Sequence, residues 1–389
     1  MSELMAYVRE QAARLEGFDP SAIDIGPVLL EAGALNRVAP YLKEQGYRKV
    51  IVAADATTIG IAGRVVEQAI SGEGIEVSAT IIRPNELGDV IADEQSLIQL
   101  ILDVRSRGVE AIIAVGSGTL HDISRMSAYA TGIPFISVPT APSVDGFNSK
   151  GAPIILRGDK QTIQSVGPDA IFADLDILTK APPALIAAGF GDMLGKYTSL
   201  FDWEFGALTG GEAYSPVIAD MTRKALSDCV QHVDEIAART PEGIRLLTGA
   251  LLESGFAMLL FGQSHPASGA EHHLSHYWET SFLRTGRRQI LHGAKVGVAC
   301  AEISGLYHRL ADEDKLPVED PDKKARIKEA IASIPRQDMI RGWLAKVGGP
   351  NTLEQLGVDN DLFERSLKEA HLIRLNRHTL LRAYNELKS

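Results

Sequence analysis

A regular alternation of short apolar runs with helical stretches between residues 50 and 173 constrains the fold more than any other feature of the chain. Amphipathic stretches such as residues 61–71 and 94–107 separate the apolar runs. The runs that read as buried strands are 50–54, 77–82, 111–115, 135–138 and 170–173. Because strand and helix alternate, we expect a parallel, doubly wound sheet with right-handed crossovers.

Residues 151–164 depart from this alternation, because two extended runs flank Arg157 to Lys160 and predict a β-hairpin. After residue 179 the strand pattern ends and helical patterns continue to the C-terminus. Breaks are expected at Gly210-Gly211, Pro266, Pro317 to Pro321 and Gly348 to Pro350. The sequence therefore predicts a Rossmann-like, doubly wound α/β domain over residues 1–178. An all-helical domain is expected over residues 179–389.

Bulk properties narrow the class of partner. The net charge of −11 argues against a nucleic acid or an anionic membrane surface. Cys229 and Cys300 are too few for a disulfide framework. No uninterrupted apolar run reaches roughly 18 residues, so no membrane insertion is expected. The start of the chain lacks the basic and apolar regions of a signal peptide. We therefore expect a cytoplasmic protein.

A glycine-containing turn, Gly116-Ser117-Gly118-Thr119, follows the third predicted strand and opens a helix that reaches Ala130. Glycines let backbone N–H groups approach a diphosphate, and a helix N-terminus favours its negative charge. Such turns are also common without a ligand, and Thr119 with Asp122 could form a helix cap. Both interpretations stay open on the residues alone.

Two further polar positions lie at the ends of predicted strands. Asp55 directly follows the predicted strand 50–54. A carboxylate at such a strand end can accept a hydrogen bond from a ribose hydroxyl, which would favour NAD over NADP. Its alternative role is to cap the next helix. The loop 139–149 follows the fourth strand, and ligands of open α/β sheets bind beyond such ends. Its polar residues are candidate ligand contacts, or turn formers: Thr140, Ser143, Asp145 and Ser149.

Three histidines are the strongest indication of a metal. Ser268 and Glu271 fit a capping box, which would place His272 in the first turn of a helix. His276 then lies one turn further along the same face, and His292 opens the next apolar stretch. Imidazole is a common ligand of divalent metals. A histidine on an apolar face can also be purely structural.

A carboxylate would complete such a site, because a catalytic divalent ion takes three protein ligands and keeps positions open. Asp192 is the candidate, since Gly189 and Gly191 let the backbone before it come close to another group. A helix cap after a glycine break is the competing interpretation.

Taken together, these segments resemble the superfamily of iron-containing alcohol dehydrogenases, glycerol dehydrogenases and dehydroquinate synthases. Within it, the chain is most similar to the bacterial type of sn-glycerol-1-phosphate dehydrogenases. Each motif is weak by itself, but five in the expected order are specific. The matching segments are Gly116 to Asp122, Pro139 to Gly146, Gly191 to Thr198, Ser268 to His272 with His276, and His292-Gly293.

The resemblance implies a dehydroquinate synthase-like fold, an NAD(P) cofactor and one divalent metal, zinc or nickel, with iron also compatible. It implies that Asp192, His272 and His292 hold the metal. His276 and Asp192 would serve catalysis, and Asp145 would contact the substrate together with them. The residues expected at the cofactor are Asp55, Gly116, Ser117, Gly118, Thr119, Leu120, His121, Asp122, Thr140, Ala141, Pro142, Ser143 and Ser149.

The activity that the resemblance implies is the interconversion of dihydroxyacetone phosphate and sn-glycerol 1-phosphate by a homodimer. A glycerol or other polyol dehydrogenase of the same superfamily is the second possibility, and a non-catalytic nucleotide- or metal-binding regulator is the third. Lys196 or another cation is expected to hold the substrate phosphate, without a firm choice among them.

Overall fold

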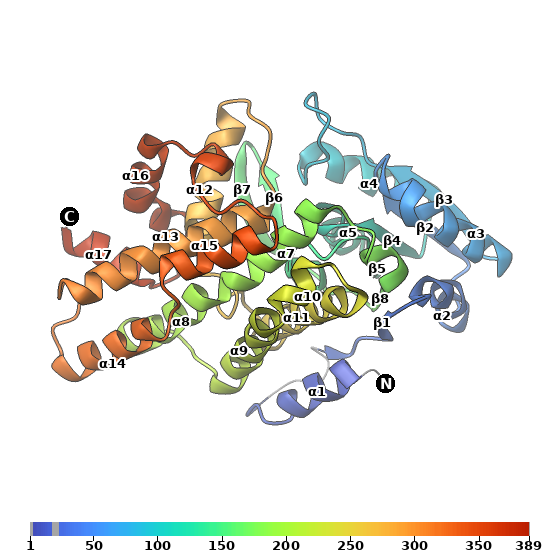
Figure 1. Ribbon diagram of the computed structural model, residues 1–389. Coiled ribbons are helices and arrows are strands. Elements are labelled where there is room, and N and C mark those ends of the chain that lie inside the picture. The colour runs from blue at the N-terminus through green and yellow to red at the C-terminus, as the bar shows by residue number, and fades with distance from the viewer. Residues whose placement is uncertain (1–2, 18–22, 389) are drawn as a thin grey trace.

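The computed structural model of the chain describes residues 3–17 and 23–388, and a six-stranded parallel sheet forms the centre of its N-terminal part (Figure 1). The strand order is β1-β8-β5-β4-β2-β3. The strands are β1 Val28–Glu31, β2 Lys49–Ala54, β3 Glu76–Ile81, β4 Ala111–Gly116, β5 Phe135–Pro139 and β8 Ala170–Asp174. All five predicted strands are confirmed. Strand β1 was not predicted, because a four-residue edge strand carries too short a pattern.

Helices cover both faces of the sheet, which explains why its strands read as continuous apolar runs. In β2, Val50 and Val52 pack with α2 (Val38–Glu44) and α3 (Arg64–Gly72). Ile51, between them, points to the other face and packs with α4 and α5. The bounds of those helices are Glu94–Arg107 for α4 and Gly118–Thr131 for α5. The predicted doubly wound arrangement is confirmed.

The hairpin expected in residues 151–164 is present as β6 (Gly151–Leu156) and β7 (Asp159–Gln164), paired in antiparallel fashion. Arg157 and Gly158 both have positive φ, 54° and 82°, as a tight two-residue hairpin turn requires. The hairpin lies outside the large sheet, where β6 contacts α5 and β7 contacts α12. In Figure 1 it stands between the N-terminal and C-terminal parts of the molecule.

The chain beyond residue 179 is helical, as predicted. Pro183 opens α7 at the first position, where a missing N–H costs nothing. Gly211 ends α8 with φ 69°. The helices are α6 Leu175–Leu178, α7 Pro183–Leu194, α8 Lys196–Gly210, α9 Pro216–Gln231, α10 Val233–Ala237, α11 Pro241–Phe261, α12 Ala270–Arg284, α13 His292–Asp312, α14 Pro321–Ala332, α15 Gln337–Lys346, α16 Asn360–Glu369 and α17 Leu380–Lys388. The N-terminal helix α1 (Glu3–Ala12) packs on α9 and α11.

Close packing of α7 against α13 brings the two helices that carry the candidate site together. A Cβ atom on Gly293 would lie 1.9 Å from the carbonyl oxygen of Ala188. One on Gly191 would lie 2.4 Å from the carbonyl oxygen of Gly293. Only glycine allows this approach, which places Asp192 of α7 beside His292 at the start of α13.

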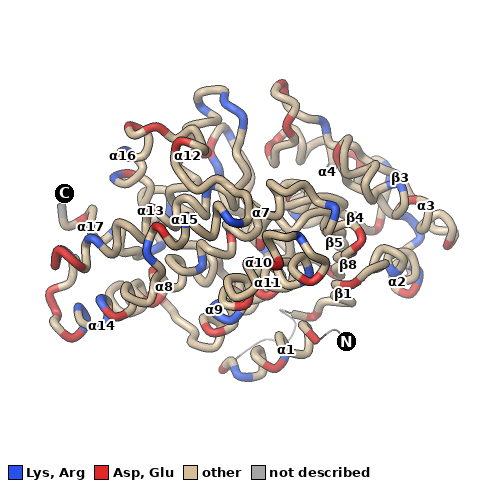
Figure 2. Tube along the Cα trace, viewed as in Figure 1, with Lys and Arg blue, Asp and Glu red and all other residues tan. Residues whose placement is uncertain are grey.

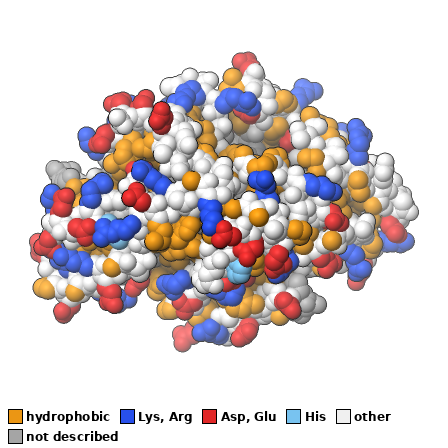
Figure 3. Space-filling model, viewed as in Figure 1, with side chains coloured by type: hydrophobic (Ala, Val, Ile, Leu, Met, Phe, Trp, Pro, Cys, Tyr) orange, Lys and Arg blue, Asp and Glu red, His pale blue; other side chains and the backbone are white. Residues whose placement is uncertain are grey.

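The surface mixes charged and apolar side chains. Figure 2 shows Lys and Arg interspersed with Asp and Glu along the outer helices, and Figure 3 shows hydrophobic side chains broken up by charged ones on the same face. By length and hydropathy, α11 could cross a bilayer, but 61% of its most apolar window is buried inside the molecule. It contacts α9, α10 and α7, as expected of a core helix.

Candidate active site

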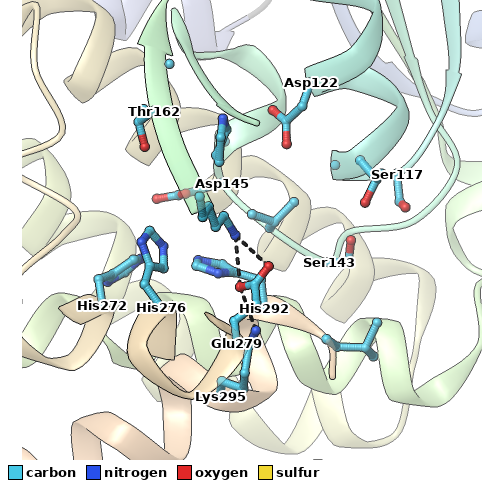
Figure 4. A pocket seen from close by; sticks show the side chains of 18 of the residues that line it. Ser117, Asp122, Ser143, Asp145, Thr162, His272, His276, Glu279, His292 and Lys295 are labelled. Carbon is cyan, nitrogen blue, oxygen red and sulfur yellow. Dashed lines mark hydrogen bonds and ion pairs between the residues drawn. The ribbon is translucent and has the colours of Figure 1, made fainter. Parts of the chain in front are cut away.

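A cavity of about 310 Å³ opens between the sheet and the helical part (Figure 4). The turn into α5, the loop after β5, the hairpin, α12 and the start of α13 supply its walls. This is the carboxyl end of the central strands, where ligands of doubly wound sheets bind. The predicted site residues that line it are Ser117, Gly118, Thr119, Asp122, Ser143, Asp145, Ser149, His272, His276 and His292.

The three predicted metal ligands converge in the structure. One donor atom from each of Asp192, His272 and His292 lies within 4.8 Å of the other two. The Asp192 Oδ1 atom is 3.7 Å from the His272 Nε2 atom and 3.9 Å from the His292 Nε2 atom. An ion with bonds of roughly 2.0–2.2 Å needs ligand atoms roughly 3–4 Å apart, so the set fits a divalent metal.

The His272 ring is oriented by a buried carboxylate. Its Nδ1 atom is 2.7 Å from Glu271 Oε1, which leaves Nε2 directed towards Asp192. The Thr198 hydroxyl donates to Glu271 Oε2 at 2.6 Å and holds that carboxylate in turn. Carboxylate–histidine pairs of this kind fix the tautomer and raise the basicity of a metal ligand.

The predicted capping box is only half correct. Glu271 does reach back, since its Oε1 atom accepts from the Gly269 N–H at 2.6 Å. Ser268 does not cap the helix. Its hydroxyl accepts from Arg374, and Asp202 of α8 accepts from the Ala270 N–H instead. A carboxylate from a distant helix takes the place of serine because negative charge is favoured at a helix N-terminus.

Asp192 is held in position by a buried network with Lys196 and Asp145. The Lys196 Nζ atom is 2.8 Å from Asp145 Oδ2 and 3.4 Å from Asp192 Oδ1. The Asp145 N–H donates to Asp192 Oδ2 at 2.9 Å. Burial and the neighbouring Asp145 raise the pKa of Asp192 to about 7, whereas a bound cation would favour its charged form. Lys196 is fully buried and paired with Asp145 and Asp192, which favours the alternative considered above, that another cation holds the phosphate.

His276 lies beside the metal ligands without joining them. Its ring centroid is 6.2 Å from that of His272 and 5.8 Å from that of His292. Burial, Lys160 and Arg374 lower the pKa of His276 well below its usual value, so its ring is neutral at physiological pH. The ring faces the cavity (Figure 4), where a substrate would contact it.

The N-terminus of α5 opens on the opposite side of the cavity. Ser117 and Ser143 lie there, away from His272 and His276 (Figure 4). No described side chain caps this helix, so the alternative of a structural cap is not observed. Its first N–H groups have no intrahelical partner and can meet a phosphate.

Other residues predicted at the cofactor lie outside the cavity lining. Asp55 Oδ1 accepts from the N–H groups of Thr57 and Thr58, which is the capping interaction considered above. The His121 ring is fully buried and bonds to the Ser117 carbonyl and the Ser137 hydroxyl. The remaining residues of this group are Gly116, Leu120, Thr140, Ala141 and Pro142. Whether any of them contacts NAD(P) stays a prediction.

A cluster of charged side chains on the cavity wall was not predicted from the sequence. Lys160 of the hairpin is 2.9 Å from both Glu279 oxygens, and Lys295 is 2.7 Å from one of them. Glu279 follows His272 by seven residues and Lys295 follows His292 by three, so helical spacing could have identified both. Arg374 also lines the cavity, but no pattern in the sequence links it to the histidines.

Comparisons with known proteins agree with this geometry. A family model described as iron-containing alcohol dehydrogenase matches residues 29–182. A protein of Geobacillus thermodenitrificans named glycerol-1-phosphate dehydrogenase (NAD(P)+) is 47% identical over 99% of this chain and 98% of its own length. One of the same name from Bacillus subtilis is 44% identical over 94% and 93%. The glycerol dehydrogenase structure of Schizosaccharomyces pombe shares the fold, with a TM-score of 0.68 and 20% identity, over 93% of this chain and 85% of that one.

Proposed function

The chain belongs to the family of glycerol-1-phosphate dehydrogenases, and from this premise we propose how its site interconverts dihydroxyacetone phosphate and sn-glycerol 1-phosphate with NAD(P). The observation that carries the proposal is the convergence of Asp192 with His272 and His292. The two histidines line a cavity that also receives the open N-terminus of α5. Metal-assisted hydride transfer needs both features in one place.

Asp192, His272 and His292 are the residues that would hold the divalent metal. Such an ion supplies Lewis-acid polarisation of a carbonyl oxygen. Asp192 is set in position by the Asp145 N–H and by Lys196, and His272 by Glu271. The chain thus fixes its ligands before any ion binds, which lowers the cost of ordering the site.

The site for NAD(P), which would supply the hydride, is proposed on the side of the cavity opposite the metal ligands. Its diphosphate would lie at the N-terminus of α5, against Ser117, Gly118 and Thr119, with Ser143 and Ser149 on the facing loop. The other residues predicted at the cofactor, which do not line the cavity, would hold these contact residues in position. The role of Asp55 at the ribose remains part of the same proposal.

His276 is the proposed proton donor to the carbonyl oxygen, directly or through a water that it holds. In the oxidation, the neutral imidazole can accept the proton of the alcohol, and in the reduction the imidazolium gives the same proton back to the oxygen. Asp145 faces the cavity, but its Oδ2 atom is 2.8 Å from Lys196 and accepts from Ser254 at 2.7 Å. We propose that it contacts the substrate while it positions Asp192.

A comparison of substrates tests the proposal. Metal-loaded protein is assayed with dihydroxyacetone phosphate, dihydroxyacetone and glycerol, and the product is resolved on a chiral column. Efficient formation of sn-glycerol 1-phosphate supports the proposal. Faster turnover of glycerol points instead to a polyol dehydrogenase, and tight NADH binding without turnover of any of them points to a regulator.

Three broader properties complete the proposal: assembly as a homodimer, a cytoplasmic location and a division into two domains near residue 178. Light scattering coupled to gel filtration measures the first, because the mass of one chain is 41.9 kDa. A species of twice that mass is expected. Cys229 and Cys300 are both free and buried, as suits a reducing compartment.

A further inference from the structure

Arg374 is the cavity-lining cation without a carboxylate partner among the described residues. Lys160 and Lys295 share Glu279, and the nearby Arg377 pairs with Glu212. None of the described carboxylates lies within ion-pair distance of the Arg374 guanidinium. Buried and half-buried charges are normally paired, so an unpaired guanidinium in a cavity indicates an anionic ligand.

Hydroxyl groups hold this guanidinium in place. Its Nη1 atom donates to the Ser268 hydroxyl at 3.0 Å and to the Ser264 hydroxyl at 3.2 Å, and its Nη2 atom donates to the Thr162 hydroxyl at 3.1 Å. These oxygens accept from arginine and keep their own hydrogens to donate. Arginine with several hydroxyls is a donor set suited to a phosphate, whose oxygens only accept.

The position of this group separates it from the nucleotide site. Thr162 lies on the His272 and His276 side of the cavity in Figure 4, away from Ser117 and Ser143. Ser268 directly precedes α12, which carries both histidines. In dihydroxyacetone phosphate, a single methylene and an ester oxygen separate the carbonyl from the phosphate. A phosphate near Arg374 is therefore compatible with a carbonyl at the metal ligands.

Neighbouring charges favour a phosphate here as well. Lys160 lies two residues before Thr162 in β7, and both line the cavity because alternate residues of a strand share a face. Lys160 and Lys295 together outnumber the one negative charge of Glu279. Burial lowers the pKa of Arg374 only to about 10, so the guanidinium stays protonated at neutral pH.

From these contacts we propose that Arg374, with Thr162, Ser264 and Ser268, binds the phosphate group of the substrate and sets the preference for phosphorylated over unphosphorylated ketones. This rests on the proposed function for the identity of the substrate, but the binding of a phosphate to Arg374 can be tested without it. Arg374 thus takes the phosphate-binding role that was considered for Lys196, because Lys196 pairs with Asp145 and Asp192.

The test uses the full-length, metal-loaded protein with Arg374→Met. Inorganic phosphate binding, measured by calorimetry, should weaken by ~10- to 100-fold, the range expected for losing charge-assisted hydrogen bonds. The kcat/KM for dihydroxyacetone phosphate should fall by a similar factor, while that for dihydroxyacetone stays unchanged. The KM values for NADH and NADPH should also stay unchanged, since a nucleotide phosphate would be bound elsewhere.

Controls keep the test decisive. Arg365→Met removes an exposed arginine, paired with Asp361, and should behave as the wild type. Arg374→Lys keeps the charge but loses the planar fork, so it should lie between wild type and Arg374→Met. If Arg374→Met does not fold, Arg374→Lys and Thr162→Val answer the question by the same assays.

Wild-type phosphate affinity in the folded Arg374 variants overturns the proposal. An equal loss with dihydroxyacetone and dihydroxyacetone phosphate also overturns it, since that would show a purely structural role. Failure of the wild-type protein to reduce dihydroxyacetone phosphate would count against the proposed function instead, and the calorimetric comparison would still decide the role of Arg374.

Discussion

Individual side chains in the metal-ligand cluster differ in what they contribute. His272 is a proposed ligand, and His232→Ala offers a matched control because His232, at the end of α9, does not line the cavity. We expect His272→Ala to lose bound metal and at least ~100-fold in activity, more than the loss of a supporting residue costs. Metal content by mass spectrometry and an NADH oxidation assay measure this. Full activity in His272→Ala would falsify the assignment of the metal site.

Glu271 makes a separate residue-scale prediction, because it acts through His272. Glu271→Gln keeps the size of the side chain but weakens its hold on the His272 Nδ1–H. The affinity for zinc or nickel, measured by chelator competition, should fall by ~10–100-fold. A purely structural residue would change the melting temperature without changing metal affinity. An unchanged metal affinity in a folded variant would contradict the positioning role.

At the scale of elements, the contact between α7 and α13 decides whether the metal ligands meet. Gly293→Ala would place a methyl group 1.9 Å from the Ala188 carbonyl oxygen and push the start of α13 away from α7. We expect a loss of ~1–3 kcal/mol in unfolding free energy from overpacking, together with weaker metal binding because His292 moves with α13. Urea denaturation and metal titration test the two effects.

A control for this prediction exists in α15. Gly342 is a helical glycine with no atoms within 4 Å of the added Cβ position. Gly342→Ala should leave metal binding unchanged and stabilise the protein by ~0.5–1 kcal/mol through helix propensity. Equal destabilisation by both substitutions would mean that the close contact of α7 and α13 is not the cause.

At the scale of the whole molecule, Glu279 joins the α/β part to the helical part. It pairs with Lys160 of the hairpin and with Lys295 of α13, and all three side chains are largely buried. Glu279→Gln would leave two lysines without a carboxylate, at a cost of ~3–5 kcal/mol in unfolding free energy. Chemical denaturation measures this.

The matching exposed ion pair lies between the same two parts. Asp159 of the hairpin pairs with Arg284 at the end of α12, and both side chains are more than half exposed. Asp159→Asn should cost no more than ~1 kcal/mol, because water screens exposed pairs. A similar loss in Asp159→Asn and Glu279→Gln would show that burial of the Glu279 network is not what matters.

The fold class could be predicted from the sequence alone, because strand and helix periodicities are local properties of the chain. Apolar runs predicted five of the six strands of the sheet, and the pattern around Arg157 to Lys160 predicted the hairpin. Helical spacing also placed His272 and His276 on one face. The glycines before Asp192 made it a candidate partner of these histidines, and resemblance to a family then implied which residues hold the metal.

Which of these residues meet depends on how the helices pack in three dimensions. The close packing of α7 on α13 brings Asp192 to His292 across one hundred residues of chain. Lys196 is committed to Asp145, and the packing of Ala370–Arg374 on α12 brings Arg374 from near the C-terminus to the cavity. The periodicity of the sequence does not predict such contacts, because they form when elements far apart in the chain bury their apolar faces against one another.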